Sequence, residues 1–323
     1  MSVYAVDGSK YTLPASSELR EEFDPESGLE NTGKGHYPQC LVSTIYDVFR
    51  RLPIAKTVVA CDSSERTEAL KMLHRVPPDN LIMFDRGYPG YDIIRKLVRN
   101  YSGHFLFRCP AKNSFLALKE FVESNKTDAI IFINPPNERQ KKTLSSKSSS
   151  ESIKLRAIKL QSPGGELSIL LTDLFDTEIY SETSLQSLYY KRWGIEVHYR
   201  DDKETAEIQE FHCKNSNGVL QEIFASSIMN VISRILMITA VEPTGGKKPE
   251  PQFKNTLKAL SNDITLFVSK NPDKVAVYFK ELLIEIARVR YYKPAIPRKS
   301  QPRVCKKPIN KWAVKKIGRI AMA

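Results

Sequence analysis

The sequence has few cysteines, and none of them form a recognisable pair. Its five cysteines lie far apart, and no Cys-x-x-Cys motif occurs in the 323 residues. A disulfide framework and a structural zinc site are therefore not expected.

Long uninterrupted apolar runs are also absent. The most apolar stretch, residues 223–241, contains Asn230, Arg234 and several serines. It predicts a buried core helix rather than a helix that crosses a bilayer. No apolar run follows Met1, so a signal peptide is not expected. Together these absences predict a cytoplasmic protein with reduced thiols and no membrane partner.

Acidic residues are missing from the end of the chain. Residues 288–323 contain 12 Lys and Arg but no Asp or Glu, and the whole chain has a net charge of +12. Removing those 12 from the 49 basic residues leaves 37, which equals the number of acidic residues. This charge segregation indicates an arm that binds a polyanion, with an anionic membrane surface as the alternative.

Two short apolar runs each end in an aspartate. Residues 3–7 and 81–85 have the composition of strands, with Asp7 and Asp85 at their carboxyl ends and a glycine shortly after each. If the two strands are parallel neighbours, their carboxylates meet at the sheet edge where α/β sites form. For either residue alone, a turn-forming or capping role is the stronger interpretation.

The remaining pattern predicts an α/β protein. Further strands are expected at 40–49 and 54–61 as a hairpin, and at 104–107, 129–133, 153–160 and 167–171. Helices are expected at 65–74, 91–98 and over most of 184–289. The serine-rich basic stretch 141–152 is typical of an exposed loop.

A third group of polar residues shares one helix face. Tyr189, Arg192, Glu196 and Lys203 follow one another at intervals of 3, 4 and 7 residues. A carboxylate between cations and a phenol suits a metal and phosphate site. The alternative is an ordinary exposed pair of Arg192 with Glu196. The neighbouring Gly194 disfavours that alternative, because glycine destabilises a helix and usually has a packing reason there.

These three groups of residues together resemble a known family. The Tyr-(2)-Arg-(3)-Glu-(6)-Lys spacing is similar to the signature of the YREK group of insertion-sequence DDE transposases. Residues 6–9 and 84–88 resemble the first and second aspartate motifs of that family, in the same order. The resemblance implies a ribonuclease-H-like mixed sheet with flanking helices, interrupted by a β-rich insertion and followed by a helical carboxyl-terminal part with the basic tail.

The resemblance also implies a division of the chain into four parts. Residues 1–108 would form the first part of the catalytic core, and 109–180 the β-rich insertion. Residues 181–245 would be the core helices that bear the glutamate, and 246–323 the helical region with the tail. The DNA-binding region that usually precedes the first aspartate motif is missing, so a truncated copy, a wrongly assigned start or a split gene is expected.

The implied activity is cut-and-paste DNA transposition. Asp7, Asp85 and Glu196 would bind two Mg²⁺ ions, or Mn²⁺, for strand cleavage at transposon ends and strand transfer to target DNA. The residues expected to contact DNA phosphates are Tyr189, Arg192 and Lys203, and more weakly Arg86, which has a surface or capping role as its alternative. A hairpin step cannot be assigned, because residues 109–180 contain no tryptophan.

Double-stranded DNA is the expected partner, with a homodimer in the DNA complex and a location at the bacterial nucleoid. Two alternatives remain: a truncated derivative that binds DNA without cutting it, and a general ribonuclease-H-like nuclease. The five histidines are not spaced like metal ligands, and each is expected to be an ordinary surface or core residue. Asp201 and Asp202 are expected to form a solvated charge cluster, because Arg200 and Lys203 flank them.

Overall fold

The computed structural model describes residues 1–25, 37–112, 115–136, 151–162, 165–240, 250–267, 271–288 and 290–291. Most of the predicted serine-rich loop and of the basic tail lies outside these residues.

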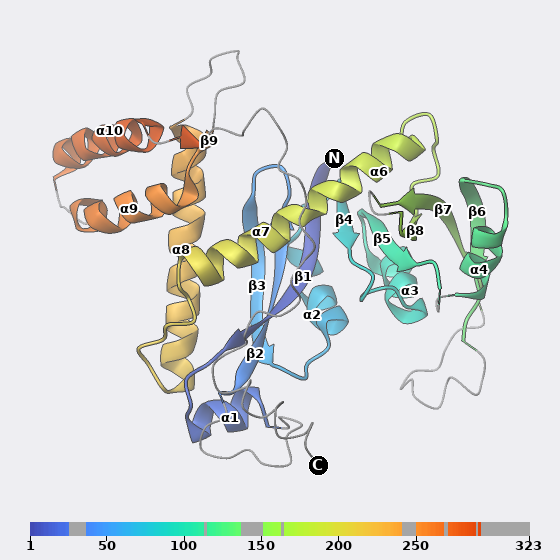
Figure 1. Ribbon diagram of the computed structural model, residues 1–323, viewed down its shortest axis with the longest axis horizontal. Helices are drawn as coiled ribbons and strands as arrows, with labels where there is room; N and C mark the ends of the chain where they lie inside the picture. Colours follow the sequence, from blue (N-terminus) through green and yellow to red (C-terminus); the bar gives the residue numbers. More distant parts are fainter. Residues whose placement is uncertain are drawn as a thin grey trace.

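A mixed eight-stranded sheet forms the centre of the molecule (Figure 1), in the order β3-β2-β1-β4-β5-β8-β7-β6. Strands β1, β4 and β5 run parallel, and the other neighbouring pairs are antiparallel. The strands are β1 (Ser2–Thr12), β2 (Gln39–Asp47), β3 (Leu52–Ala60), β4 (Asn80–Phe84), β5 (His104–Pro110), β6 (Asp128–Ile133), β7 (Ile153–Gln161) and β8 (Leu167–Thr172).

Helices cover both faces of this sheet (Figure 1). One face packs against α1 (Ser17–Phe23), α6 (Glu182–Tyr190), α7 (Gly194–Arg200) and α8 (Ser216–Thr239). The other face packs against α2 (Glu65–Met72), α3 (Tyr91–Asn100) and α4 (Leu116–Glu123). Helices α9 (Phe253–Phe267) and α10 (Pro272–Arg288) pack on the end of α8, beside the short strands β9 (Glu250–Pro251) and β10 (Arg290–Tyr291).

Burial on both faces explains the apolar composition of the central strands. In β1, Val3 and Ala5 belong to one core cluster, whereas Tyr4 and Val6 belong to the other. Successive side chains of a strand point to opposite faces, so a strand covered on both sides needs apolar residues at every position. The mixed sheet with flanking helices confirms the predicted fold class.

The β-rich segment 109–180 joins the same sheet. Its strands β8, β7 and β6 extend the sheet from β5, which pairs antiparallel with β8. The proposed boundary at residues 108 and 109 falls inside β5. The predicted hairpin is present as β2 and β3.

Helix α8 departs from its prediction as a buried core helix. Val219, Ile223 and Leu236 are buried, but Ile228 and Ile238 are 60% and 55% exposed. In length and composition alone the helix could cross a membrane, with 28% of its most apolar window buried. Its packed face also contains polar Asn230, which is bonded to a core aspartate. The helix is therefore half-buried, because only one of its faces packs against the rest of the protein.

Candidate active site

Strand pairing places the two predicted aspartates beside each other. β1 and β4 are parallel, and their register ends with Val6 opposite Phe84. Asp7 and Asp85 are the next residue of each chain segment, so both lie where the parallel pairing stops. The prediction that β1 ends at Asp7 is wrong, because β1 continues to Thr12 through its antiparallel pairing with β2.

Gly8 next to Asp7 lies against the side chain of Glu65, at the start of α2. A Cβ atom at this position would lie 2.7 Å from Cδ of Glu65, so a larger residue here would require the flexible end of the exposed Glu65 side chain to move. The Gly8 backbone N–H also donates a hydrogen bond of 3.0 Å to Oδ1 of Asp7, which holds this carboxylate in place.

The glutamate lies on a helix that changes its winding twice. After α6, residues 191–193 form a 3₁₀ turn, α7 follows, and residues 201–205 form a π-helical turn. A Cβ on Gly194, where α7 begins, would lie 3.4 Å from Cε1 of Tyr46 in β2, which is an ordinary contact distance. The packing reason that the sequence predicted for this glycine therefore stays a prediction.

One guanidinium contacts all three predicted acids. Nη2 of Arg192 lies 2.9 Å from Oε1 of Glu196 and 3.7 Å from Oδ2 of Asp85. Nη1 of the same group lies 3.7 Å from Oδ2 of Asp7. The Arg192 side chain is only 6% exposed. The structure therefore gathers Asp7, Asp85 and Glu196, which are far apart in the sequence, around a single buried cation.

Burial makes the site electrostatically unfavourable for the ionised form of Asp7. Desolvation raises the pKa of the Asp7 carboxyl to about 7, and the nearby charges of Glu65 and Asp85 act in the same direction. The Arg192 charge lowers that pKa but does not offset the burial. Nη1 of Arg192 is buried without a hydrogen-bond partner. Three acids share one incompletely bonded cation, which leaves the site short of positive charge.

This donor set suits a hard divalent cation. Mg²⁺ prefers carboxylate oxygens, and a metal site formed by one or two carboxylates with water and phosphate is common for it. Within the part of the chain that the structure describes, no three His, Cys, Asp or Glu residues lie at metal-binding spacing. The Arg192 guanidinium lies between the three acids and supplies the positive charge there.

The predicted phosphate contacts have different surroundings. The Tyr189 hydroxyl donates to Oδ1 of Asp85 at 3.2 Å and to the carbonyl of Phe84 at 3.3 Å, so it orients that aspartate. Nζ of Lys203 donates to Ser9 Oγ and to the Lys10 carbonyl, both at 2.7 Å.

Arg86 has a more exposed position. Its side chain is 51% exposed and forms an ion pair of 2.9 Å with Glu166 in the loop before β8. Arg86 directly follows Asp85 in the chain, but among the described residues its ion-pair partner is Glu166 and not one of the three acids.

Two residues at this site, Tyr199 and Glu65, were not predicted from the sequence. The buried Tyr199 hydroxyl donates to the Asp7 carbonyl at 2.7 Å and to the Val42 carbonyl at 3.1 Å, which fixes the backbone of Asp7. Tyr199 lies three residues after Glu196, so its helical spacing could have placed it near the same face. Glu65 gave no such signal, because only the fold brings α2 to Gly8.

A second polar cluster lies further along the same helix. Asp202 is completely buried and accepts hydrogen bonds from the Tyr11 hydroxyl at 2.9 Å, from Lys56 at 3.0 Å and from Asn230. The prediction of a solvated charge cluster is wrong for this residue. Burial alone would raise the pKa of Asp202, but the adjacent His198 ring, the Lys56 ammonium and the hydrogen bonds from Lys56 and Tyr11 hold it below its usual value.

His198 belongs to the same cluster and is a core residue, one of its two predicted roles. Its ring stacks on Tyr46 with centroids 5.3 Å apart, and burial lowers its pKa to about 4. Its Nδ1 lies 3.7 Å from Oδ1 of Asp202, away from the three acids. Histidine at this position is therefore a neutral packing residue at neutral pH.

The sheet, its helices and the acidic site define a protein of the kind found among DDE enzymes, and comparison with known sequences identifies the family. Residues 1–231 match the family described as the transposase DDE domain, and the chain belongs to this family. The match does not distinguish the YREK group from others, so that assignment stays a prediction. No curated protein sequence matches the chain significantly.

A solved structure shares the fold. The piggyBac transposase, in a synaptic complex with hairpin DNA, superposes with a TM-score of 0.50 at 10% sequence identity. The match covers 93% of this chain and 60% of that chain, so the present chain corresponds to about three fifths of the piggyBac protein. At this level of identity the likeness shows a common fold.

Proposed function

We propose that the protein is the catalytic protein of a DNA transposase that cleaves strands at transposon ends and joins them to target DNA. The contact of Arg192 with all three acids is the observation that supports this most strongly. It brings Asp7, Asp85 and Glu196, predicted from three separate motifs, to one edge of the sheet. The family match over residues 1–231 supports the same conclusion independently.

In this proposal Asp7, Asp85 and Glu196 hold two divalent ions, Mg²⁺ or alternatively Mn²⁺. Members of this family generally use divalent metal ions. When bound, such ions activate the attacking oxygen and stabilise the leaving oxygen of a phosphodiester. The raised pKa of Asp7 fits this role, because a buried carboxylate gains most from a cation that replaces its lost hydration.

The surrounding residues position the acids and bind phosphate. Tyr189 and Tyr199 hold Asp85 and the backbone of Asp7, respectively. Arg192 offers a planar guanidinium whose geometry suits phosphate oxygens as well as carboxylates. Lys203 and Arg86 add positive charge on either side of the acids and would contact the phosphates of the transposon end.

The same proposal covers the partners and the location of the protein. Its partner is double-stranded DNA, both at the transposon ends and at the target, and a homodimer holds the two ends together. The chain would act at the nucleoid in the cytoplasm. The apolar helix α8 does not argue for a membrane here, because its packed face bonds a core aspartate through Asn230.

DNA cleavage by a matched pair of variants tests this function. Purified wild-type protein, expressed from its element with any upstream reading frame, is incubated with Mg²⁺ and DNA that carries the element's own ends. Glu196→Gln should lower cleavage at least about 10³-fold, since removing one group from a catalytic set typically costs this much or more. Glu210→Gln, a change of the same kind at an exposed position, should cleave like wild type.

Three outcomes would overturn the proposal. Equal cleavage by wild type and Glu196→Gln would show that the acids are not the active site. Equal cleavage of DNA with and without the element's ends would favour a general nuclease. If the full-length protein binds those ends and never cuts them, the protein is a non-cleaving DNA-binding derivative.

A further inference from the structure

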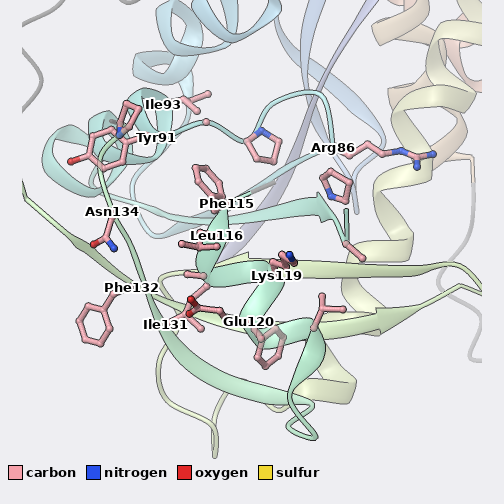
Figure 2. A pocket seen from close by; sticks show the side chains of 18 of the residues that line it. Arg86, Tyr91, Ile93, Phe115, Leu116, Lys119, Glu120, Ile131, Phe132 and Asn134 are labelled. Atoms are coloured by element: carbon pink, nitrogen blue, oxygen red, sulfur yellow. The ribbon is translucent and has the colours of Figure 1, made fainter. Parts of the chain in front are cut away.

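A large open groove lies on the α3 and α4 face of the sheet, and Arg86, the residue after Asp85, is part of its lining. It has a volume of about 1860 Å³ and is lined by the start of α3, residues Lys112 and Phe115 between β5 and α4, α4 itself and β6. Figure 2 shows Arg86 at one end and Tyr91 and Asn134 at the other, with Phe115 and Leu116 between them. Because Arg86 follows Asp85, this end of the groove opens next to the predicted catalytic acids.

The topology explains why the groove leads away from the site. β4 and β5 are parallel and end at the edge where Asp85 lies. The helices that follow them, α3 and α4, begin at this edge and run back along the same face of the sheet. The space between the two helices therefore runs from the acids toward the outer strand β6.

Positive charge is concentrated in this groove. Positions 1–287 contain equal numbers of acidic and basic residues. The groove nevertheless has six basic lining residues against the three acidic residues Asp92, Glu120 and Glu123. The basic ones are Arg66, Arg86, Lys96, Lys112, Lys119 and Lys126. The local excess is therefore a property of this surface and not of the body as a whole.

Most of these cations have no acidic partner. Lys96, Lys112 and Lys119 are exposed, and none of them forms an ion pair within the residues that the structure describes. Asp92 lies four residues before Lys96 on α3, and Glu123 lies four residues after Lys119 on α4, yet neither pairs with its neighbour. Lysines that remain unpaired beside available acids keep their full charge for an external anion.

Apolar side chains lie among these lysines. Leu116 is 71% exposed and Phe132 is 55% exposed, and both line the groove. An open surface with exposed lysine side chains and apolar side chains between them suits the sugar-phosphate backbone of a nucleic acid. That backbone presents phosphates and deoxyribose together. A small anion would instead need a closed site with buried donors.

From this charge and position, we propose that the groove binds the backbone of double-stranded DNA that continues from the cleavage site past Arg86. Lys96, Lys112 and Lys119 contact successive phosphates without reading sequence. The inference rests on the proposed function only for the identity of the polyanion as DNA. It adds a second DNA contact region, separate from Tyr189, Arg192 and Lys203.

Salt-dependent DNA binding tests the groove without any cleavage. The triple variant Lys96→Ala, Lys112→Ala, Lys119→Ala is made in a Glu196→Gln background and titrated with a fluorescent duplex of unrelated sequence, without divalent metal. The control changes three exposed lysines of α9 and α10, namely Lys254, Lys258 and Lys274, to alanine. Figure 1 places these helices at the opposite end of the molecule from α4 and β6.

The groove variant should bind about tenfold or more weakly at low salt. Its slope of log affinity against log salt should be shallower by about 2–3, since each lost phosphate contact removes about 0.9. The control should keep the wild-type slope. Equal slopes in the two variants would overturn the proposal, as would an unchanged affinity of the groove variant for the duplex. A failure of Glu196-dependent cleavage would leave this binding result unaffected, so the two proposals fail separately.

Discussion

Two clusters of charge lie on the same helical segment, six residues apart, and they are built in opposite ways. Around Asp202, three donors lie within hydrogen-bond distance: Tyr11, Lys56 and Asn230 all donate to a completely buried carboxylate. Around Glu196, three acids share one guanidinium, and two of its three contacts are 3.7 Å long. The Asp202 carboxylate thus has three hydrogen-bond donors of its own, whereas the three acids around Glu196 are short of positive charge.

We infer that this difference separates a structural role of Asp202 from the proposed catalytic role of the three acids. A buried charge with all its partners fixes the packing of the elements that supply them, here β1, β3, the π-helical turn and α8. A cluster of three acids in which burial raises the pKa of Asp7, around an incompletely bonded cation, instead costs stability in the metal-free protein. We infer that the Asp202 cluster anchors the helix so that the Glu196 cluster can remain ready for ligands.

The largest change in the free energy of unfolding is expected when Asp202 is replaced. Asp202→Ala leaves the buried Lys56 ammonium without its partner, and we expect a loss of about 3–5 kcal/mol in the free energy of unfolding. Chemical denaturation measures it. The double variant Lys56→Met, Asp202→Leu should regain much of this loss, because it removes both charges. A loss below about 1 kcal/mol for Asp202→Ala would show that the cluster is not an anchor.

A smaller change in the free energy of unfolding, of opposite sign, is expected when Asp7 is replaced. Asp7 has a pKa of about 7 in the folded protein, above its value of about 3.9 in an unfolded chain. The folded state therefore holds a proton that the unfolded state has lost between about pH 4 and pH 7. Stability of the metal-free protein should fall as pH rises through this window.

The variant Asp7→Asn should remove that pH dependence. At pH 8 without divalent metal it should be about 1–3 kcal/mol more stable than wild type, since each pKa unit corresponds to about 1.4 kcal/mol. Thermal unfolding at several pH values measures this. The exposed surface change Asp79→Asn is the control and should leave the pH profile unchanged. A wild-type profile that is flat from pH 4 to pH 7 would contradict the raised pKa.

The grouping of Asp7, Asp85 and Glu196 was easier to predict from the sequence than the cluster around Asp202, for a physical reason. The apolar strands before Asp7 and Asp85 and the helical spacing of Tyr189, Arg192 and Glu196 are local patterns, and parallel strands necessarily bring their ends to one edge. The partners of Asp202 come from β1, β3 and α8, which are up to 191 residues away. Its charged neighbours therefore predicted a solvated cluster instead.

Two other differences between the predicted and the observed structure also arise from long-range packing. β1 continues beyond Asp7 because β2 pairs with it there, and that pairing depends on a strand about 35 residues further along the chain. The exposed face of α8 could not be told from its buried face by composition, since both contain isoleucines. Local pattern predicted the elements, whereas long-range packing determined how far each extends and which face it buries.

Metal binding by the purified, metal-free protein tests the central claim most directly, that Asp7, Asp85 and Glu196 form one cation site completed by a ligand. Calorimetric titration with Mg²⁺ compares wild type, Glu196→Gln and Asp202→Asn. We predict that Glu196→Gln weakens binding by about tenfold or more, and that folded Asp202→Asn binds like wild type. Equal affinity in wild type and Glu196→Gln, or a loss only in Asp202→Asn, would contradict the account.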